Sequence, residues 1–501
     1  MTIIPRSSGI LMHISSLPGN FGIGDLGLSA FKFVDFLSET GTNFWQVLPL
    51  NPTGYGNSPY QGLSAFAGNP LFIDPRHLVE LNLLKAGDIC NPPNFPKQNV
   101  NFEKTIRFKN NLFSKAFAAF ISLKKSPLLT KYDAFKESNQ CWLEDFCLFM
   151  AIRENYHLSS WKDWPNPLKL REPQAILFFE EQHTKEVEFH AFLQFIFHLQ
   201  WQNLLDYSHS KGIHFIGDIP IFLGYDCADV WVHPELFILN DNLETQVVAG
   251  VPPDYFSPAG QLWGNPLYDW KEHHQDHYDW WIKRIKETLK FVDIIRLDHF
   301  RGFAAYYQIP TNAITAKEGE WVIGPGLDFF NILQSELGIL PFIAEDLGVI
   351  TPDVIELRDR FNLPGMKILQ FAFGGDASSD YLPHNFPVNC VAYTGTHDNP
   401  PSLDWYQNIA GENERQFCNQ YLGKSKELIS RAMIRSIWSS VAKLAIAPMQ
   451  DVLALGANAR MNIPGTPQGN WQWRMKSGAV SKDINKWLGE INRVYNRSLD
   501  L

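Results

Sequence analysis

The segment Phe291-Val-Asp-Ile-Ile-Arg296-Leu-Asp298 is a short, almost continuous apolar run that ends in charged side chains. Runs of this length, bounded by polar residues, are typical of strands that are buried on both faces of a parallel sheet. Residues two apart on a strand point to the same side, so Arg296 and Asp298 would share one side at the end of this strand. The segment therefore predicts a buried parallel strand that presents charged groups at its carboxyl end.

Seven further runs of the same character lie along the chain. They are found near Gly9–His13, Phe44–Leu48, Ile213–Asp218, Phe342–Glu345, Met366–Phe371, Asn389–Thr394 and Leu444–Met449. Helical patterns fall between them, for example over residues 30–37, where apolar side chains recur at i, i+3, i+4 and i+7. Strand followed by helix, repeated over eight strands, predicts an α/β fold of the (β/α)8 TIM barrel type.

Two insertions interrupt this pattern. Residues 53–212 are too long for one loop in a compact domain and their apolar spacing is helical, so we expect a large, mostly helical insertion between strands 2 and 3. Its subdomain is placed at about 77–188. A smaller insertion at about 224–275 is rich in Pro, Asp, Tyr and Trp and is expected to be ordered loop, with a proline-stiffened lid at Val251–Gly260. Residues 1–501 are interpreted as a single catalytic barrel.

Composition narrows the classes of partner. The net charge is −10 and the Lys and Arg residues are scattered, so no basic stripe is present to bind nucleic acid. No apolar run reaches about 18 residues and no leader peptide is recognisable, which predicts a cytoplasmic protein without a membrane partner. The six cysteines lack metal-ligand spacing and are interpreted as free thiols in a reducing compartment. His273, His274 and His277 could bind a metal but are better explained as a solvated helix face. Neither a metal nor a cofactor is therefore expected. The oligomeric state stays open.

Three acidic residues, Asp298, Glu345 and Asp398, each follow one of the predicted strands. Carboxylates gathered at the carboxyl ends of barrel strands are how this fold assembles a site for acid, base and nucleophilic chemistry. Each acid taken alone is equally compatible with a structural role. Three acids on the fourth, fifth and seventh strands are more economically explained as one site, and the pattern points to glycosidic bonds.

The neighbours of these acids suggest distinct roles. Arg296 beside Asp298 would lower the pKa of that carboxyl and keep it ionised, as a nucleophile requires. Partial burial at a strand end would raise the pKa of Glu345 toward the range of a general acid. The pair His397 and Asp398 is suited to binding two sugar hydroxyls and tightening in the transition state.

Two loops combine aromatic rings with amide side chains. They are Thr53-Gly-Tyr55-Gly-Asn-Ser-Pro-Tyr60-Gln61 and Gly260-Gln261-Leu-Trp263-Gly-Asn265-Pro-Leu-Tyr268. Sugar rings have apolar C–H faces and polar edges, so such loops can bind them. Ordinary loop packing is the alternative interpretation.

In combination, five segments resemble the 4-α-glucanotransferases of glycoside hydrolase family 77, also called amylomaltases or disproportionating enzymes. The segments are Arg296-Leu-Asp298-His-Phe-Arg-Gly-Phe, Ala344-Glu345-Asp-Leu-Gly, Thr394-Gly-Thr-His397-Asp398-Asn, Gly217-Asp218-Ile-Pro-Ile and Ser58-Pro-Tyr60-Gln. The resemblance runs from about residue 9 to residue 474. It implies a retaining double displacement that transfers an α-1,4-glucan segment to the 4-hydroxyl of glucose or of another α-1,4-glucan, with malto-oligosaccharides as substrates.

The resemblance also implies roles for individual residues. Asp298 would be the nucleophile, Glu345 the general acid and then base, and Asp398 the transition-state stabiliser, supported by Arg296 and His397. The residues implied to bind substrate are Tyr60, Asp218, Asp254, Gln261, Trp263, His299 and Asn462, with Tyr55 at a secondary glucan site. This chain departs from the family pattern at Asn57, where many members have Asp, and at Pro400-Pro401, where the family often continues Asp-Thr.

Two other functions stay open at this stage. An α-glucan hydrolase on the same scaffold would use the same motifs, because the motifs do not determine whether water or a sugar intercepts the glycosyl-enzyme ester. A glucan-binding protein with an inactive barrel belongs to a different class. The lid and the number of aromatic residues favour transfer.

Overall fold

The computed structural model describes residues 4–253, 259–423, 427–466 and 468–498. At its centre, eight parallel strands form a closed barrel in the order β1-β12-β11-β10-β9-β6-β3-β2. The barrel strands are β1 (Ser7–Leu11), β2 (Phe44–Gln46), β3 (His214–Ile219), β6 (Ile294–Leu297), β9 (Phe342–Ala344), β10 (Gly365–Ile368), β11 (Cys390–Tyr393) and β12 (Leu444–Pro448). Every predicted apolar run overlaps one of them, so the predicted TIM barrel is confirmed.

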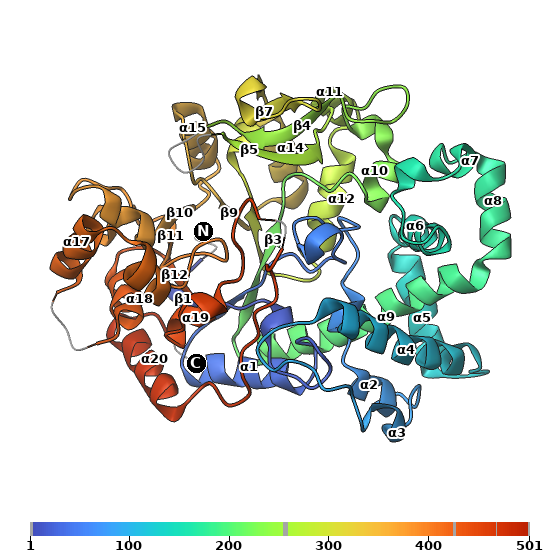
Figure 1. Ribbon diagram of the computed structural model, residues 1–501, viewed down its shortest axis with the longest axis horizontal. Helices are drawn as coiled ribbons and strands as arrows, with labels where there is room; N and C mark the ends of the chain where they lie inside the picture. Colours follow the sequence, from blue (N-terminus) through green and yellow to red (C-terminus); the bar gives the residue numbers. More distant parts are fainter. Residues whose placement is uncertain (1–3, 254–258, 424–426, 467, 499–501) are drawn as a thin grey trace.

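Helices connect and cover these strands. The longer ones outside the first insertion are α1 (Leu28–Glu39), α12 (Asp279–Thr288), α14 (Gly326–Leu337), α15 (Pro352–Arg360), α17 (Glu412–Leu422), α18 (Ile429–Ser439) and α20 (Lys482–Val494). They are amphipathic: α18 buries Met433 and Ile437 and exposes Arg435. Figure 1 shows α17, α18 and α20 together on one side of the barrel. The alternation of strand and helix along the chain is what holds all barrel strands parallel.

The long interval between β2 and β3 is helical, as its apolar spacing indicates. It contains α2 (Pro75–Glu80), α3 (Ala86–Ile89), α4 (Phe102–Ile121), α5 (Pro127–Ser138), α6 (Leu143–Asn155), α7 (Asn166–Lys169), α8 (Pro173–Gln182) and α9 (Thr184–Ser210). Figure 1 shows α4 to α8 gathered to the right of the barrel, while α9 returns to it beside α1. The subdomain boundaries at 77 and 188 stay a prediction.

Two glutamines attach α9 to the segment that follows β2. The Gln194 side-chain amide accepts from Gly68 N at 2.8 Å and donates to Gly68 O at 2.9 Å. The Gln200 amide accepts from Asp74 N at 2.7 Å and donates to Asp74 O at 3.2 Å. An amide side chain can satisfy a backbone donor and a backbone acceptor together. The helix is therefore joined at two points to the segment that follows β2.

A second sheet lies outside the barrel. Its four strands run antiparallel in the order β5-β4-β7-β8 and are β4 (Val247–Val251), β5 (Gln261–Pro266), β7 (Ala305–Pro310) and β8 (Glu320–Ile323). Figure 1 shows this sheet above the barrel. The interpretation of 224–275 as loop alone is thus wrong, because the interval contains β4 and β5 and two short helices, Ala228–Val232 and Trp270–Gln275. The centre of the expected lid, residues 254–258, lies outside the described residues. Asp254, a predicted substrate-binding residue, belongs to this segment and is therefore also outside them.

Short helices complete the chain. They are α10 (Ala228–Val232), α11 (Trp270–Gln275), α13 (Arg301–Ala304), α16 (Ser402–Asp404) and α19 (Met449–Val452). In α11, His273 is buried against Tyr268 and Trp270, whereas His274 is exposed. The expected solvated histidine face is therefore correct for His274 and His277, which are exposed, and wrong for His273.

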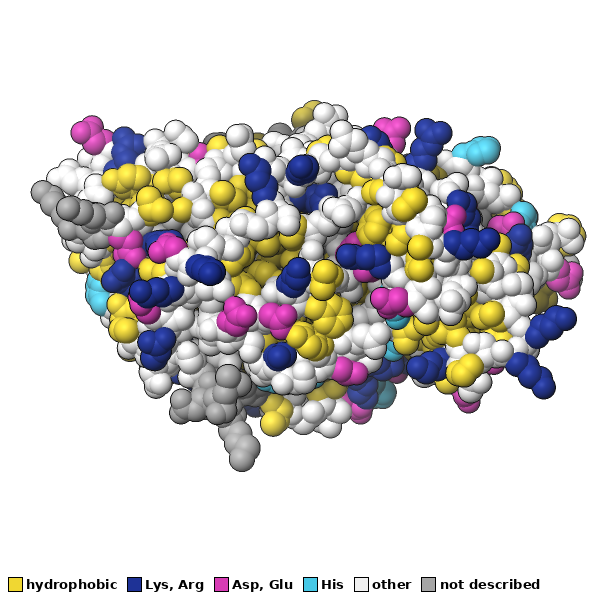
Figure 2. Space-filling model, turned by 90° about the horizontal axis from the view of Figure 1, so that it is seen from below, with side chains coloured by type: hydrophobic (Ala, Val, Ile, Leu, Met, Phe, Trp, Pro, Cys, Tyr) yellow, Lys and Arg dark blue, Asp and Glu magenta, His cyan; other side chains and the backbone are white. Residues whose placement is uncertain are grey.

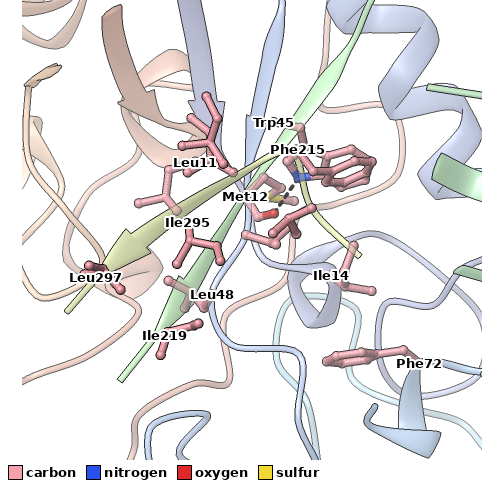
Figure 3. Packing of buried hydrophobic residues seen from close by; sticks show 14 of the residues in the cluster. Leu11, Met12, Ile14, Trp45, Leu48, Phe72, Phe215, Ile219, Ile295 and Leu297 are labelled. Atoms are coloured by element: carbon pink, nitrogen blue, oxygen red, sulfur yellow. Dashed lines mark hydrogen bonds between the residues drawn. The ribbon is translucent and has the colours of Figure 1, made fainter. Parts of the chain in front are cut away.

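Large aromatic and aliphatic side chains fill the barrel wall. In Figure 3, Trp45 of β2 lies against Phe215 of β3, with ring centroids 5.0 Å apart. The Trp45 indole N–H donates to the Met12 carbonyl at 2.7 Å, so its polar atom is satisfied inside the core. Burying one such large apolar side chain contributes about 1.5–3 kcal/mol. This packing fixes the strands that carry the charged residues of the cleft.

The surface seen from below mixes charges of both signs with scattered apolar side chains (Figure 2). No helix within the described ranges is long and apolar enough to cross a membrane.

Candidate active site

A cleft of about 600 Å³ opens at the carboxyl ends of the barrel strands. The predicted site residues that line it are Tyr55, Tyr60, Gln261, Trp263, Arg296, Asp298, His299, Glu345, His397, Asp398 and Asn462. Asp218 does not line this cleft but contacts two residues that do, Tyr60 and Arg296. Strand ends that are far apart in sequence meet here because the barrel is closed and parallel.

Arg296 is a cation shared by two acids. The pairing of β3 with β6 places Asp218 beside Arg296. Arg296 Nη1 lies 2.8 Å from both carboxylate oxygens of Asp218 and 2.8 Å from Asp298 Oδ1. The Asp218 side chain is 0% exposed, and the Asp298 side chain is 28% exposed toward the cleft. Burial raises the pKa of Asp218, with Arg296 opposing that rise. Arg296 therefore fixes the position of Asp298 while one side of that carboxylate stays open to the cleft.

Glu345 is held by main-chain donors. It follows β9, and its Oε2 accepts from His299 N at 2.7 Å while Oε1 accepts from Leu347 N at 3.3 Å. Burial raises the pKa of Glu345 well above its usual range; Arg296 opposes this rise, and the charge of Asp298 adds to it. This is the direction predicted from the sequence. A carboxyl of this kind keeps its proton at a higher pH than a solvated glutamate and can act as an acid.

Asp398 sits in a more open environment. Its side chain is 43% exposed, and its Oδ2 lies 3.3 Å from His397 Nε2. Its Oδ1 accepts from Asn462 Nδ2 at 2.6 Å. Arg460 donates to the main-chain carbonyls of Asp398 and Asn462, both at 2.9 Å. The third acid is thus positioned by an imidazole, an amide and a guanidinium, and Arg460 is a contributor that the sequence did not reveal.

Hydrogen bonds to buried side chains hold the turn that follows Asp398. Gln370 Nε2 donates to the Pro400 carbonyl at 3.0 Å. The buried Asp451 carboxylate accepts from the Thr394 hydroxyl and from both the backbone N–H and the hydroxyl of Ser402, each at 2.6 Å. The unusual Pro400-Pro401 pair therefore lies in a segment with fixed ends.

Three rings form one wall of the cleft. Tyr60 stacks on His397 with ring centroids 5.1 Å apart and an interplanar angle of 17°, and Trp471 lies 5.8 Å from Tyr60 and 5.9 Å from His397. The Tyr60 hydroxyl donates to Asp218 Oδ2 at 2.8 Å, which fixes the ring. Trp471 was missed from the sequence. Its segment Asn470-Trp471-Gln472-Trp473 has the same mixture of aromatic and amide residues as the two loops that were recognised.

Trp263 and His299 form a second group of rings in the cleft. Their rings meet edge to face with centroids 4.9 Å apart, and the Trp263 indole N–H donates to Gln261 Oε1 at 3.2 Å. Burial lowers the pKa of His299 to about 4, so the imidazole is neutral at pH 7. Within the described part of the chain, His299 Nε2 is buried and has no hydrogen-bond partner. That nitrogen is suited to a polar group of a bound molecule.

Tyr55 lies at the rim of the cleft, where 80% of the residue is exposed. Tyr55 follows Gly54 and begins a short turn in which Gly56 has φ 66°. A ring this exposed is available to a ligand outside the cleft.

Comparisons with known proteins agree on one family. The sequence profile of a family described as 4-alpha-glucanotransferase matches residues 12–481. The chain is 46% identical over 488 residues to the 4-alpha-glucanotransferase of Thermus thermophilus, covering 96% of this chain and 97% of that protein. It is 44% identical over 490 residues to that of Clostridium butyricum, covering 97% and 100%. The solved structure of the amylomaltase from Streptococcus agalactiae, in complex with acarbose, matches with a TM-score of 0.95 and 37% identity, covering 99% of this chain and 100% of that one.

Proposed function

The chain belongs to the 4-alpha-glucanotransferase family and is a 4-alpha-glucanotransferase, and from this premise we propose how its cleft carries out the transfer. We assign the nucleophile to Asp298, the general acid and base to Glu345, and transition-state stabilisation to Asp398. The observation that carries this assignment is the unequal environment of the first two acids. Asp298 is ion-paired with Arg296, whereas burial raises the pKa of Glu345.

In the first half-reaction, an oxygen of Asp298 attacks the anomeric carbon at the donor's α-1,4 bond. The bond from that carbon to the glycosidic oxygen breaks, and Glu345 gives its proton to the departing oxygen. The donor segment then remains on Asp298 as an ester with an inverted anomeric centre. A retaining mechanism of this kind needs the two carboxyl groups about 5–5.5 Å apart.

In the second half-reaction, Glu345 is a carboxylate and removes the proton from the 4-hydroxyl of an acceptor sugar. The acceptor oxygen attacks the anomeric carbon, Asp298 is released, and the α configuration is restored. Asp398 and the neutral His299 imidazole would bind sugar hydroxyls, and their hydrogen bonds would strengthen as the ring flattens. Glucose and malto-oligosaccharides are the proposed acceptors.

The walls of the cleft support α-glucan binding. Tyr60, Trp471 and Trp263 line the same cleft as the three acids. Such rings pack against the apolar faces of sugars, and amides such as Gln261 and Asn462 are suited to the polar edges. The same proposal places Asp254 at the substrate and Tyr55 at a secondary glucan site.

The decisive experiment is incubation with maltotriose alone. Transfer conserves the number of glycosidic bonds, so glucose and longer dextrins should accumulate while total reducing ends stay constant. A steady gain in reducing ends would instead establish hydrolysis as the main reaction. The same assay on Asp298→Asn separates a catalytic acid from a glucan-binding protein, because binding of maltoheptaose should persist when turnover is lost.

A matched control is available beside the general acid. Asp346 follows Glu345 directly but accepts from Met366 N at 2.7 Å and pairs with Arg358, and it does not line the cleft. Asp346→Asn should therefore retain transfer activity provided that the variant folds, whereas Glu345→Gln should lose that activity. The same proposal places the enzyme in the cytoplasm, because the cysteine pattern favours a reducing compartment. Cell fractionation checks this location.

A further inference from the structure

Two histidines and an aspartate converge at the amino ends of β3 and β6. His209 is in the last turn of α9, His214 is the first residue of β3, and Asp293 directly precedes β6. Their potential ligand atoms all lie within 4.8 Å of one another, and no other trio of His, Cys, Asp or Glu in the described ranges meets that condition. The established activity uses none of these residues.

The distances suit a small metal ion. His209 Nε2 lies 3.0 Å from Asp293 Oδ1, and His214 Nδ1 lies 3.4 Å from the same oxygen. Around tetrahedral Zn²⁺, with bonds of about 2.0–2.2 Å, neighbouring ligand atoms are about 3.3–3.5 Å apart. The side chains of His209, His214 and Asp293 are 40%, 42% and 27% exposed, so the imidazoles can rotate and an ion can enter from solvent.

The backbone around the three residues is already fixed. Asp293 Oδ2 accepts from Phe215 N at 2.8 Å, and Asp293 N donates to Phe215 O at 3.0 Å. A tight turn joins His209 to β3, with Gly212 N donating to His209 O at 3.0 Å. Main-chain hydrogen bonds that orient a ligand carboxylate are typical of the outer shell of metal sites. Little ordering would therefore be needed when an ion binds.

We propose that His209 Nε2, His214 Nδ1 and Asp293 Oδ1 form a binding site for Zn²⁺, with water as the remaining ligand. The candidate site is empty in this structure. Two imidazoles and one carboxylate suit zinc better than magnesium or calcium, which prefer oxygen ligands alone. Without the ion, the same atoms form hydrogen bonds between the imidazoles and the carboxylate, so the metal replaces shared protons.

The position of the site determines its effect. His214 and Asp218 are both on β3 and are separated by four residues, which corresponds to about 13 Å along a strand. The ion would therefore bind at the opposite end of the strand from the cleft. It would join the end of α9 to two barrel strands and stabilise the folded chain, because a ligand that binds only the folded state raises Tm.

Titration of EDTA-treated protein with ZnCl2 by calorimetry tests the proposal. We expect one ion per chain with a micromolar Kd and a rise in Tm when Zn²⁺ is added. His209→Ala and His214→Ala should each weaken binding at least tenfold. His274→Ala is the matched control, since His274 is an exposed histidine that also contacts an aspartate, Asp328, at 2.8 Å. It should leave the Kd unchanged.

X-ray absorption on the zinc-loaded wild-type protein provides a test that does not depend on how the variants fold. The spectrum should show two imidazole nitrogen ligands, with oxygen atoms as the other ligands, all at about 2.0–2.2 Å from the zinc. The proposal is overturned if no saturable binding occurs at zinc concentrations 100-fold below 1 mM. It is also overturned if the double variant His209→Ala, His214→Ala binds zinc as tightly as wild type does, or if the spectrum shows sulfur ligands.

Discussion

The two ends of β3 and β6 carry ionisable groups in opposite settings. At the carboxyl ends, Asp218 and Arg296 have side chains that are 0% and 5% exposed. At the amino ends, His214 and Asp293 have side chains that are 42% and 27% exposed. Both pairs are close contacts, yet charges interact far more strongly when buried than when solvent can screen them. The catalytic end therefore differs from the opposite end in how deeply its ionisable side chains are buried.

The largest effect should come from the acid that faces both Arg296 and the cleft. Asp298→Asn removes the proposed nucleophile, so kcat for maltotriose disproportionation should fall by about 10⁴-fold or more. Glucose release measured by chromatography checks this, with thermal melting to show that the variant is folded. Retention of more than about one per cent of the activity would contradict a nucleophilic role.

Glu345→Gln should have the next largest effect. The amide cannot give up or take a proton, so kcat should fall by about 10²–10⁴-fold. A donor with an activated leaving group, such as a maltosyl fluoride, does not need the acid in the first step. That donor should therefore recover part of the loss, and equal defects with both donors would argue against the acid role.

The same substitution should stabilise the protein at neutral pH. Since the folded-state pKa of Glu345 is raised, its contribution to stability is fully present below its ordinary pKa of 4.5 and is lost as pH rises through the raised value. Glutamine does not ionise, so the variant does not lose this stability as pH rises. The Tm of Glu345→Gln minus that of wild type should therefore increase with pH across that window and reach at least about 2 °C. A constant difference between pH 4 and pH 8 would refute buried ionisation.

Tyr60→Phe should cause a smaller loss. It removes the 2.8 Å hydrogen bond to the buried Asp218 and loosens the ring wall. We expect kcat/KM to fall about tenfold, because a hydrogen bond to a charged group contributes about 1.5–3 kcal/mol. Tyr278→Phe is the matched control: its hydroxyl donates to Asp328 at the same 2.8 Å, away from the cleft. Equal kinetic losses in the two variants would remove the distinction.

The smallest effect is expected at the amino end. The hydrogen bond to Asp293 raises the pKa of His214, with burial opposing. Its stabilisation is therefore fully present below the ordinary pKa of 6.5 and is lost as pH rises through the raised value. In EDTA, His214→Asn should lower Tm by about 2 °C or less at pH 6, as for a partly exposed ion pair, and by less at pH 8.5. A larger loss at the higher pH would reverse the sign and contradict this account.

The barrel could be predicted because buried parallel strands leave a clear trace in the sequence. Each is a short apolar run with no polar alternation, and the acids stand out where such a run ends. The outer sheet leaves no such trace. Three of the four residues of β8 are exposed, and β5 contains glycine and proline, so its pairing depends on partners far away in sequence.

The site was predictable in part for the same reason, because Asp298, Glu345 and Asp398 follow predicted strands. Trp471 instead lies in an irregular segment with φ 64°. Its position is held by a hydrogen bond from its backbone N–H to the Met461 carbonyl at 2.7 Å. No local periodicity encodes that placement. The position of Asp218 beside Arg296 likewise depends on the register between β3 and β6, which spacing along the sequence does not specify.

The two oxygens of Glu345 are held by the backbone N–H groups of His299 and Leu347, and His299 adjoins Asp298 in sequence. A main-chain donor is unaffected by most substitutions, because every residue except proline supplies one. Under the proposed mechanism, the path of the main chain therefore sets the position of the acid, whereas the Arg296 side chain fixes that of the nucleophile. A substitution beside the acid should therefore leave both of its main-chain donors in place.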